Sequence, residues 1–434
     1  MAGTTSRFQV DEKYKGLESN IWIELNTLND DLGNCVNLGQ GFPDYQPALH
    51  IVEHLAAVCK PDPELYAFHQ YARAFGHPRL AKALATLYTR LVGVQIDWAS
   101  EVLVTGGAYG ALFYTIMSNI GKGDEVIIVE PYFDCYEPMV LLAGGTPVYI
   151  PLKPDENSGD STSSAQWKLD MKELSSLFNA KTKAIILNTP NNPLGKVFSR
   201  EELTDIARLC MKHDVLVISD EVYEWIVYGE EEHIRIASLP GMWERTVTIG
   251  SAGKTFSLTG WKLGWAYGPA SLMRNLQIAH QNCTYMCQTP EQEAVGAALE
   301  NELELLGKPT SYFHQMRKEL TLKREQLSKA ISDAGMTPIL PQGGYFILAK
   351  WTSLKKKIGK ELESQGEKLK AWPYEDMKFA IWLAKNKQLL GIPPSAFYSL
   401  PHKHLGGDYI RFNFFKRKET LEKADNILRA LKES

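Results

Sequence analysis

Five short segments carry side chains that can do chemistry, and one of them, Ser251–Lys262, places a lysine among small residues. A lysine amine held in such surroundings, after an apolar run, can act as a nucleophile toward a carbonyl group, and Lys254 is the candidate. Gly253-Lys254-Thr255 also matches the end of a triphosphate-binding loop, but that motif requires a glycine five residues before Gly253. Thr248 stands there, so a nucleotide-triphosphate loop is excluded.

Two more segments offer an acid and amides at the ends of apolar runs. Asp220 follows such a run, and its carboxylate could cap a helix or hold a proton on a heteroaromatic nitrogen. Residues 188–195 hold two prolines, with Asn188 and Asn192 as amide donors and acceptors. This stretch is either an ordinary Asn/Pro/Gly turn or a polar wall of a site.

The last two segments suit anions. Residues 105–109 form a Thr-Gly-Gly-Ala-Tyr turn in which small residues let backbone N–H groups approach a phosphate at a helix N-terminus. The glycines could also serve the turn geometry alone. In 409–414, strand alternation puts Tyr409, Arg411 and Asn413 on one face, which is either a solvent-facing side or a clamp for a carboxylate.

The elements that must position these segments alternate regularly from about residue 100. The patterns predict strands at 102–105, 125–130, 146–151, 184–187, 215–219, 246–251 and 263–267, with helices at 109–119, 133–143, 170–178 and 200–213. Such alternation predicts an α/β fold with a mostly parallel sheet covered by helices on both faces. Ligands of these sheets bind beyond the carboxyl ends of the strands, where the five segments lie.

Beyond about residue 305 the pattern changes to long helices (312–334, 374–386) separated by strands (345–350, 409–414). This predicts a second, smaller α+β domain. We expect an N-terminal arm with part of the small domain at 1–45, a large domain at 46–305 and a small domain at 306–434. The polar stretch 153–166 is predicted to be a surface loop, and the charged stretch 355–370 a solvated excursion.

Bulk properties exclude several classes of protein. The net charge of −4 argues against a nucleic-acid partner, and no apolar run reaches the roughly 20 residues that span a bilayer. Because Asp11 and Glu12 accompany Arg7, the start resembles neither a signal peptide nor a transit peptide. We expect a soluble intracellular, cytoplasmic protein, or a mitochondrial-matrix one if a leader is removed. Six cysteines are too sparse for a disulfide scaffold, and we expect reduced thiols and no metal site.

In order and spacing, from about Trp22 to Arg411, the five segments together resemble the fold-type-I aminotransferases of subgroup Iγ, which depend on pyridoxal 5′-phosphate (PLP). The resemblance implies a large domain with a mostly parallel seven-stranded sheet, plus a smaller α+β domain. It implies that Lys254 forms a Schiff base with PLP and then moves the substrate proton. Asp220 would pair with the pyridine nitrogen, so that the cofactor supplies the chemistry and the protein the orientation.

The same resemblance assigns the other site residues. Tyr223 and Asn192 would bind the ring hydroxyl, Phe133 would stack on the ring, and Arg411 with Asn192 would bind the substrate α-carboxylate. The phosphate would be held by Gly107, Ala108, Ser251 and Lys262. The pocket for the substrate side chain would be lined by Trp22, Gly41, Tyr109 and Tyr285. Tyr71 would reach the phosphate of a neighbouring subunit, which implies a homodimer with shared active sites.

Four stretches narrow the resemblance to kynurenine aminotransferases, also described as glutamine transaminase K and cysteine-conjugate β-lyase: 37–44, 130–138, 239–245 and 341–346. The implied reaction moves the amino group of kynurenine, or of another large apolar or aromatic amino acid, glutamine or methionine, to an α-keto acid. Kynurenine would yield kynurenic acid, and β-elimination from cysteine S-conjugates would be a side reaction.

One position departs from the pattern, because Tyr285-Met286 stands where vertebrate members carry Phe-His, a change that alters the polarity of the pocket. Two alternatives share the fold and the cofactor. One is a PLP-dependent lyase or cyclopropane-forming synthase, which would show no amino-group exchange. The other is a non-catalytic PLP-sensing regulator, which requires a DNA-binding module, and no basic helix precedes Trp22.

Overall fold

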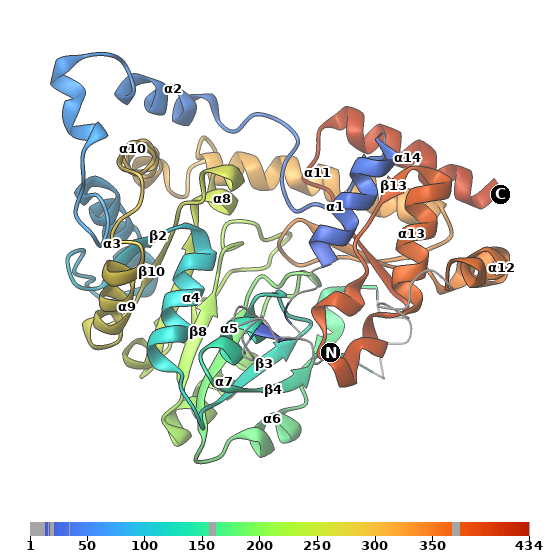
Figure 1. The fold of residues 1–434 in the computed structure, drawn as a ribbon, viewed down its shortest axis with the longest axis horizontal. Helices are drawn as coiled ribbons and strands as arrows, with labels where there is room; N and C mark the ends of the chain where they lie inside the picture. Colours follow the sequence, from blue (N-terminus) through green and yellow to red (C-terminus); the bar gives the residue numbers. More distant parts are fainter. Residues whose placement is uncertain are drawn as a thin grey trace, which may run out of the picture.

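A seven-stranded sheet forms the centre of the larger part of the structure (Figure 1). The computed structural model describes residues 14–15, 17, 21–33, 35–155, 162–366 and 374–433. The strand order is β2-β10-β9-β8-β7-β3-β4, and only β10 runs antiparallel to its neighbours. The bounds are β2 (Val102–Thr105), β3 (Glu125–Glu130), β4 (Thr146–Pro151), β7 (Thr182–Asn188), β8 (Leu216–Asp220), β9 (Thr246–Ser251) and β10 (Gly264–Tyr267). The prediction of a mostly parallel sheet is confirmed.

Both faces of this sheet are buried, as the continuous apolar strands require. Ile128, Ile186 and Ile218 point to one face, where they pack with α4, α5 and α9. Their neighbours Ile127 and Ile185 point to the other face, against α6 and α7. These helices are α4 (Gly107–Asn119), α5 (Tyr136–Leu142), α6 (Met171–Leu177), α7 (Arg200–His213) and α9 (Ala270–Cys283).

Local signals explain where these helices begin. Ser199 and Glu202 form a reciprocal capping box at the start of α7, and the Asp170 carboxylate accepts hydrogen bonds from the first turn of α6. Helix α5 begins at Tyr136 rather than at the predicted Phe133, because residues 131–135 form an irregular turn after β3. The predicted helices therefore exist, with shifts confined to their ends.

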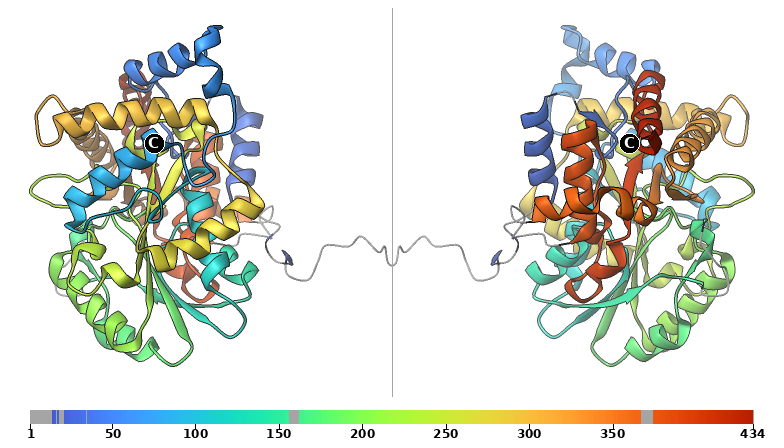
Figure 2. Two further views of the ribbon diagram at one scale, coloured as in Figure 1. Left: turned by 90° about the vertical axis from the view of Figure 1, so that its left-hand side faces the viewer. Right: turned by 90° about the vertical axis from the view of Figure 1, so that its right-hand side faces the viewer.

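The C-terminal part is built on a three-stranded antiparallel sheet, β11 (Thr337–Ile339), β12 (Phe346–Lys350) and β14 (Tyr409–Asn413). Around it lie α11 (Tyr312–Asp333), α13 (Glu375–Lys387), α14 (Lys418–Glu433) and the 3-10 turns η8 (Thr352–Leu354), η9 (Pro394–Phe397) and η10 (Leu400–Gly406). The N-terminal segment joins this part, because β1 (Val36–Asn37) pairs with β13 (Leu389–Leu390). Helix α1 (Ile21–Leu32), dark blue in Figure 2, packs Ile21 and Leu25 against Met377 and Ile381 of α13. The predicted domain bounds (1–45, 46–305 and 306–434) stay a prediction.

The structure departs from two predictions for polar stretches. The charged stretch predicted as a solvated excursion begins with helix α12 (Lys355–Gly366), and the prediction is wrong for Ile358 and Leu362, which are buried one turn apart; residues 367–370 lie outside the described residues. Among the side chains described in this helix only these two apolar ones are buried, so the many lysines and glutamates around them gave the stretch the composition of a solvated segment. Within 153–166, β5 (Lys153–Pro154) pairs with β6 (Trp167–Lys168), and Ser164 in η4 (Ser164–Gln166) is buried; 156–161 are outside the described residues.

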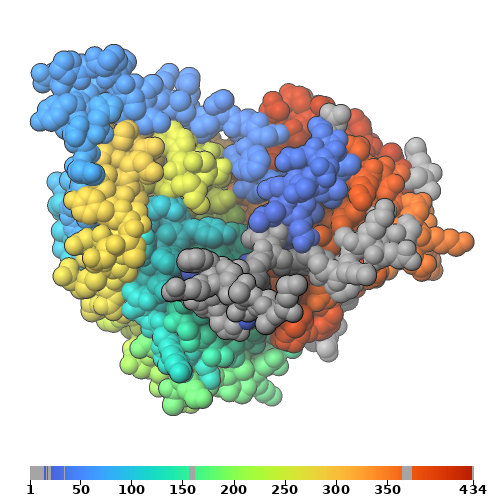
Figure 3. All heavy atoms as spheres, in the orientation of Figure 1, coloured from blue at the N-terminus to red at the C-terminus, as the bar shows by residue number. Residues whose placement is uncertain are grey.

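Helix α2 (Leu49–Val58) and the 3-10 turn η2 (Pro63–His69) project from one corner of the molecule (Figure 3). They leave Leu49 and Tyr66 about two-thirds exposed. Beside them, α3 (Pro78–Val92) packs against α10 (Thr289–Leu305). In the described part of the chain, every helix is too short or too polar to cross a membrane. The six cysteines are free thiols.

Candidate active site

One cavity of about 430 Å³ opens at the carboxyl ends of the parallel strands, beside the C-terminal sheet. It brings together every predicted site residue except Tyr71 and Tyr285. Those that line it are Trp22, Gly41, Gly107, Ala108, Tyr109, Phe133, Asn192, Asp220, Tyr223, Ser251, Lys254, Lys262 and Arg411. The five segments therefore meet at one place, as their positions at strand ends predict.

Lys254 projects into this cavity from α8 (Ala252–Thr255), a single turn that directly follows β9. Its Nζ donates a hydrogen bond to the Gly41 carbonyl oxygen (3.1 Å) and another to the Tyr345 hydroxyl (2.8 Å). The Tyr345 hydroxyl in turn donates to the same Gly41 oxygen (2.7 Å). The amine is thus aimed by groups from both ends of the chain, without a carboxylate among these partners.

Asp220 ends strand β8 at the floor of the cavity and is 3% exposed. Tyr136, from the start of α5, donates a hydrogen bond to its Oδ2. Burial raises the pKa of Asp220 to about 6, although the Tyr136 hydrogen bond opposes this shift. A buried carboxylate that is still mostly ionised at neutral pH is suited to pairing with a protonated ring nitrogen.

Arg411 is fully buried, so the interpretation of its strand face as a solvent-facing side is wrong for Arg411 and Asn413. Its Nη1 donates to the Asn192 side-chain oxygen (2.7 Å) and its Nη2 to the Gly39 carbonyl (2.9 Å), whereas Nε has no partner among the described residues. Burial lowers the pKa of Arg411 to about 10, so it remains charged at neutral pH. A buried guanidinium whose hydrogen bonds go to uncharged acceptors is a site for an anion.

The turn before α4 forms a second anion site. Gly107 has a φ of 72° at the start of the helix, a conformation that favours glycine. A Cβ on Gly264 would lie 2.5 Å from the Ala108 backbone nitrogen, so the close approach of the two strand ends requires glycine there as well. Lys262 stands beside this turn, and burial together with the charge of Lys254 lowers its pKa. Helix N–H groups beside the Lys262 amine suit a phosphate.

Aromatic side chains form the remaining wall. The rings of Tyr109 and Phe133 meet edge to face with centroids 5.5 Å apart. The Trp22 indole N–H donates to Asp134 (2.6 Å), which fixes the orientation of the tryptophan ring, and the Phe346 ring centroid lies 3.9 Å from the Arg411 guanidinium carbon. This wall fits flat or apolar groups next to the anion site of Arg411.

Tyr71 and Tyr285 lie outside the cavity of the single chain. Their side chains are 84% and 49% exposed, and their rings meet edge to face on the surface with centroids 5.7 Å apart. The cofactor and substrate roles implied for them therefore require a second subunit and stay predictions.

Sequence reasoning missed several residues of the site. Tyr136 and Tyr345, which contact Asp220 and Lys254, are absent from the predicted set, although both lie in stretches quoted for the family resemblance. Their partners are 84 and 91 residues away, so no local spacing connects them. Gln40, Phe42, Asn188 and Phe346 also line the cavity; Asn188 was noted as an amide at a strand end, and the other three lie in stretches quoted for the family resemblance without a role.

Comparison with known proteins agrees with this geometry. The model of the family "Aminotransferase class I and II" matches residues 33–427. Kynurenine–oxoglutarate transaminase 3 of Homo sapiens is 49% identical over 98% of this chain and 90% of its own length, and transaminase 1 of the same species is 47% identical over 96% and 97%. The structure of N-succinyldiaminopimelate aminotransferase from Mycobacterium tuberculosis superposes with a TM-score of 0.85 at 31% identity, covering 98% of this chain and all of the other. The chain therefore belongs to the class I and II aminotransferases, a family of enzymes that use PLP.

Proposed function

We propose that this aminotransferase binds PLP at Lys254 and moves the amino group of kynurenine, and of other large apolar or aromatic amino acids, to an α-keto acid. Kynurenine then yields kynurenic acid, and glutamine and methionine are further donors. The observation that carries the proposal is one cavity holding an amine (Lys254), a buried carboxylate (Asp220) and a buried guanidinium (Arg411) that hydrogen-bonds to uncharged acceptors. The names of the human relatives support kynurenine and oxoglutarate as substrates.

The residues present fit PLP. When bound, PLP supplies an aldehyde that takes up amino groups and a ring that withdraws electrons from the substrate Cα. The N–H groups of Gly107 and Ala108, with Ser251 and Lys262, would hold the phosphate, and Asp220 would keep a proton on the ring nitrogen. In addition, Tyr223 and Asn192 would hydrogen-bond the ring hydroxyl and Phe133 would cover one ring face.

Arg411 and Asn192 would bind the α-carboxylate that every amino-acid and keto-acid substrate carries. That contact would place the substrate Cα next to Lys254, whose neutral amine would take the proton from Cα and return it to the carbon of the cofactor aldehyde, two atoms away. The Gly41 carbonyl and the Tyr345 hydroxyl orient the amine for both transfers. Trp22, Tyr109 and Phe346 exclude water and contact the substrate side chain, which favours flat or apolar ones.

Chemical trapping tests the cofactor site directly. Borohydride reduction followed by digestion should leave a pyridoxyl tag on the peptide that spans Lys254, and Lys254→Ala should retain PLP weakly while losing transamination. A tag on another lysine, or substantial turnover by the variant, would contradict the proposal. Kinetics with a panel of amino donors that includes kynurenine then ranks the substrates. Absence of amino-group exchange with any keto acid would favour the lyase alternative.

Exposed apolar and aromatic side chains on and just after α2 and η2 support a homodimer with shared active sites. Leu49 in α2, Tyr66 in η2 and Tyr71 just after η2 are each at least two-thirds exposed, which suits a partner surface more than solvent. In the dimer, Tyr71 would reach the phosphate in the other subunit. Light scattering should give twice the chain mass, and Tyr71→Phe should weaken PLP binding without altering the dimer. A monomer that binds PLP as tightly as the native protein would contradict this arrangement.

A further inference from the structure

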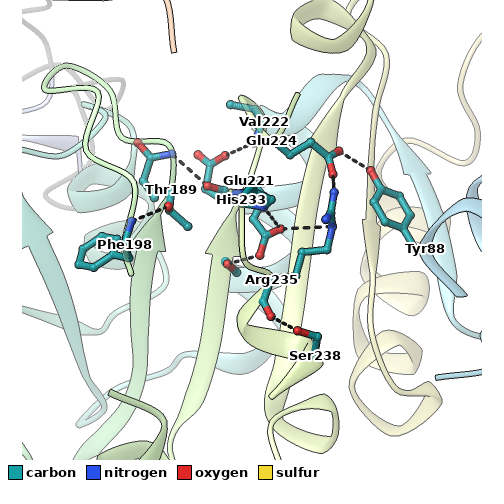
Figure 4. A network of polar contacts seen from close by, with 12 residues as sticks. Tyr88, Thr189, Phe198, Glu221, Val222, Glu224, His233, Arg235 and Ser238 are labelled. Atoms are coloured by element: carbon teal, nitrogen blue, oxygen red, sulfur yellow. Dashed lines mark hydrogen bonds and ion pairs between the residues drawn. The ribbon is translucent and has the colours of Figure 1, made fainter. Parts of the chain in front are cut away.

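Directly behind the turn that carries Asp220 and Tyr223 lies a buried network of charged side chains (Figure 4). Glu221, Glu224 and Arg235 have side chains only 1%, 2% and 8% exposed. Arg235 forms an ion pair with Glu224, and its Nε lies 3.9 Å from Glu221 Oε2. His233 Nε2 lies 2.7 Å from the same Glu221 oxygen. Figure 4 shows Arg235 reaching both carboxylates.

The outer oxygens of the two carboxylates are bound as well. Ser219 Oγ donates to Glu221 Oε1 (2.8 Å), and the Tyr88 hydroxyl donates to Glu224 Oε1 (2.6 Å). Tyr88 itself accepts a hydrogen bond from the Trp265 indole (2.9 Å). The network therefore connects the turn after β8 to helix α3 and strand β10, elements that are far apart in the sequence.

These anchors add to the packing of the turn's own side chains, because Val222 and Tyr223 are buried and Trp225 stacks on Phe313 with ring centroids 4.0 Å apart. Residues 221–225 belong to neither a helix nor a strand, and their backbone contacts include Glu221 N–H to Ile249 O (3.0 Å) and Glu224 N–H to Glu221 O (2.9 Å). Asp220 and Tyr223 line the cavity, whereas Glu221 and Glu224 do not. The two glutamates are bound behind the turn while the aspartate and the tyrosine face the cavity in front of it.

Burying several charges is not an efficient way to stabilise a fold. Replacing a buried ion pair by apolar side chains of similar volume is often neutral or stabilising, because the charges lose their hydration. What a fully hydrogen-bonded network provides is a single, directional arrangement of the groups attached to it. The network lies behind Asp220 and Tyr223, which must meet a planar ring with an accuracy of a fraction of an ångström. A fixed arrangement behind them would therefore serve the site.

We propose that Glu221 and Glu224, held through Arg235, are positioning residues that set Asp220 and Tyr223 against the ring of the cofactor. This proposal rests on the proposed function, since it needs a ring in the cavity. Neither glutamate touches the cofactor. Their effect passes through the backbone of the turn to the carboxylate and the hydroxyl that do.

The test removes both partners of the Arg235–Glu224 ion pair and leaves Glu221 in contact with Ser219 and His233. The double variant Glu224→Met/Arg235→Met is expected to fold, with the melting temperature of its cofactor-free form close to native. Its dissociation constant for PLP, measured by titrating the cofactor-free protein, should rise roughly 10- to 100-fold, in line with the loss of groups that support a binding site from behind. The pH dependence of the visible absorbance of its bound PLP should shift, which a merely structural role would not produce.

Glu224→Gln, which keeps the shape of the side chain but loses its charge, provides a second measurement and decides the question if the double variant does not fold. Glu302→Gln is the matched control, because Glu302 is also buried (2% exposed) and hydrogen-bonded, to Ser311 and Tyr312, and is not part of the network. An unchanged PLP dissociation constant and absorbance profile in a folded network variant would overturn the positioning role and leave the proposed function intact. Native protein that binds no PLP would instead refute the proposed function.

Discussion

The buried acid of the site should make the cofactor-free protein less stable than it could be. Burial raises the pKa of Asp220 from 3.8 to about 6, so the folded chain holds this proton more tightly than the unfolded chain does. A carboxyl pKa that is higher in the folded state lowers the free energy of unfolding. This loss is absent below pH 4, grows as the pH rises from 4 to 6, and is complete above pH 6. A difference of about two pKa units corresponds to about 3 kcal/mol.

Asp220→Asn removes this titration and keeps an oxygen that accepts the Tyr136 hydrogen bond. We therefore expect the cofactor-free variant to be more stable than native protein at pH 8, by up to about 3 kcal/mol, or roughly 3 °C in melting temperature for a chain of this length. The advantage should be about 1 kcal/mol smaller at pH 5, because Asp220 is then mostly protonated. PLP affinity should fall at the same time, since the charge that pairs with the ring nitrogen is gone.

The assay is calorimetry or circular dichroism of cofactor-free protein from pH 5 to 8. Asp214→Asn is the control, because that side chain is 94% exposed and replacing it should change the melting temperature little at any pH. If Asp220→Asn is less stable than native protein at pH 8, or if the difference does not shrink toward pH 5, then burial does not destabilise this carboxylate and the reasoning fails.

Three further predictions concern contacts of the site. Tyr136→Phe removes the hydrogen bond that lowers the pKa of Asp220, so in the variant this carboxylate should take up its proton at a higher pH. As the pH is lowered, the PLP affinity should therefore begin to fall at a higher pH than in native protein. Binding titrations across pH measure this, and an unchanged pH profile would contradict it. Arg411→Ala should raise KM for the amino acid and the keto acid alike, by about 10- to 100-fold, because both carry the same carboxylate; an effect on the amino acid alone would exclude the clamp. Gly264→Ala places a Cβ 2.5 Å from the Ala108 nitrogen and should weaken PLP binding at least about tenfold, whereas Gly359→Ala, with open space around it, should not; equal PLP affinities in the two variants would remove the phosphate role from this turn.

Local patterns were sufficient where neighbouring residues determine the structure. The predicted strands 102–105, 125–130, 146–151 and 246–251 and the predicted helix 200–213 match the structure at both ends, since apolar runs and a Ser/Glu capping box mark their limits. The same approach failed at α12, where two buried side chains lie among many charged ones. It also left helices such as α3 and α10 unpredicted, although Pro78 opens α3 at the position that favours proline.

The amino-acid sequence alone determined which chemical groups are available and that they follow strand ends, and strand ends of a parallel sheet share one edge. These two facts predicted the position of the cavity and most of the residues that line it. Only the tertiary structure decided that Arg411 is buried beside uncharged acceptors and that burial raises the pKa of Asp220. It also decided that Glu221 and Glu224 are bound behind the turn that carries Asp220 and Tyr223. Burial and contacts between residues many positions apart depend on how the elements pack, and periodicity along a chain does not encode those distances.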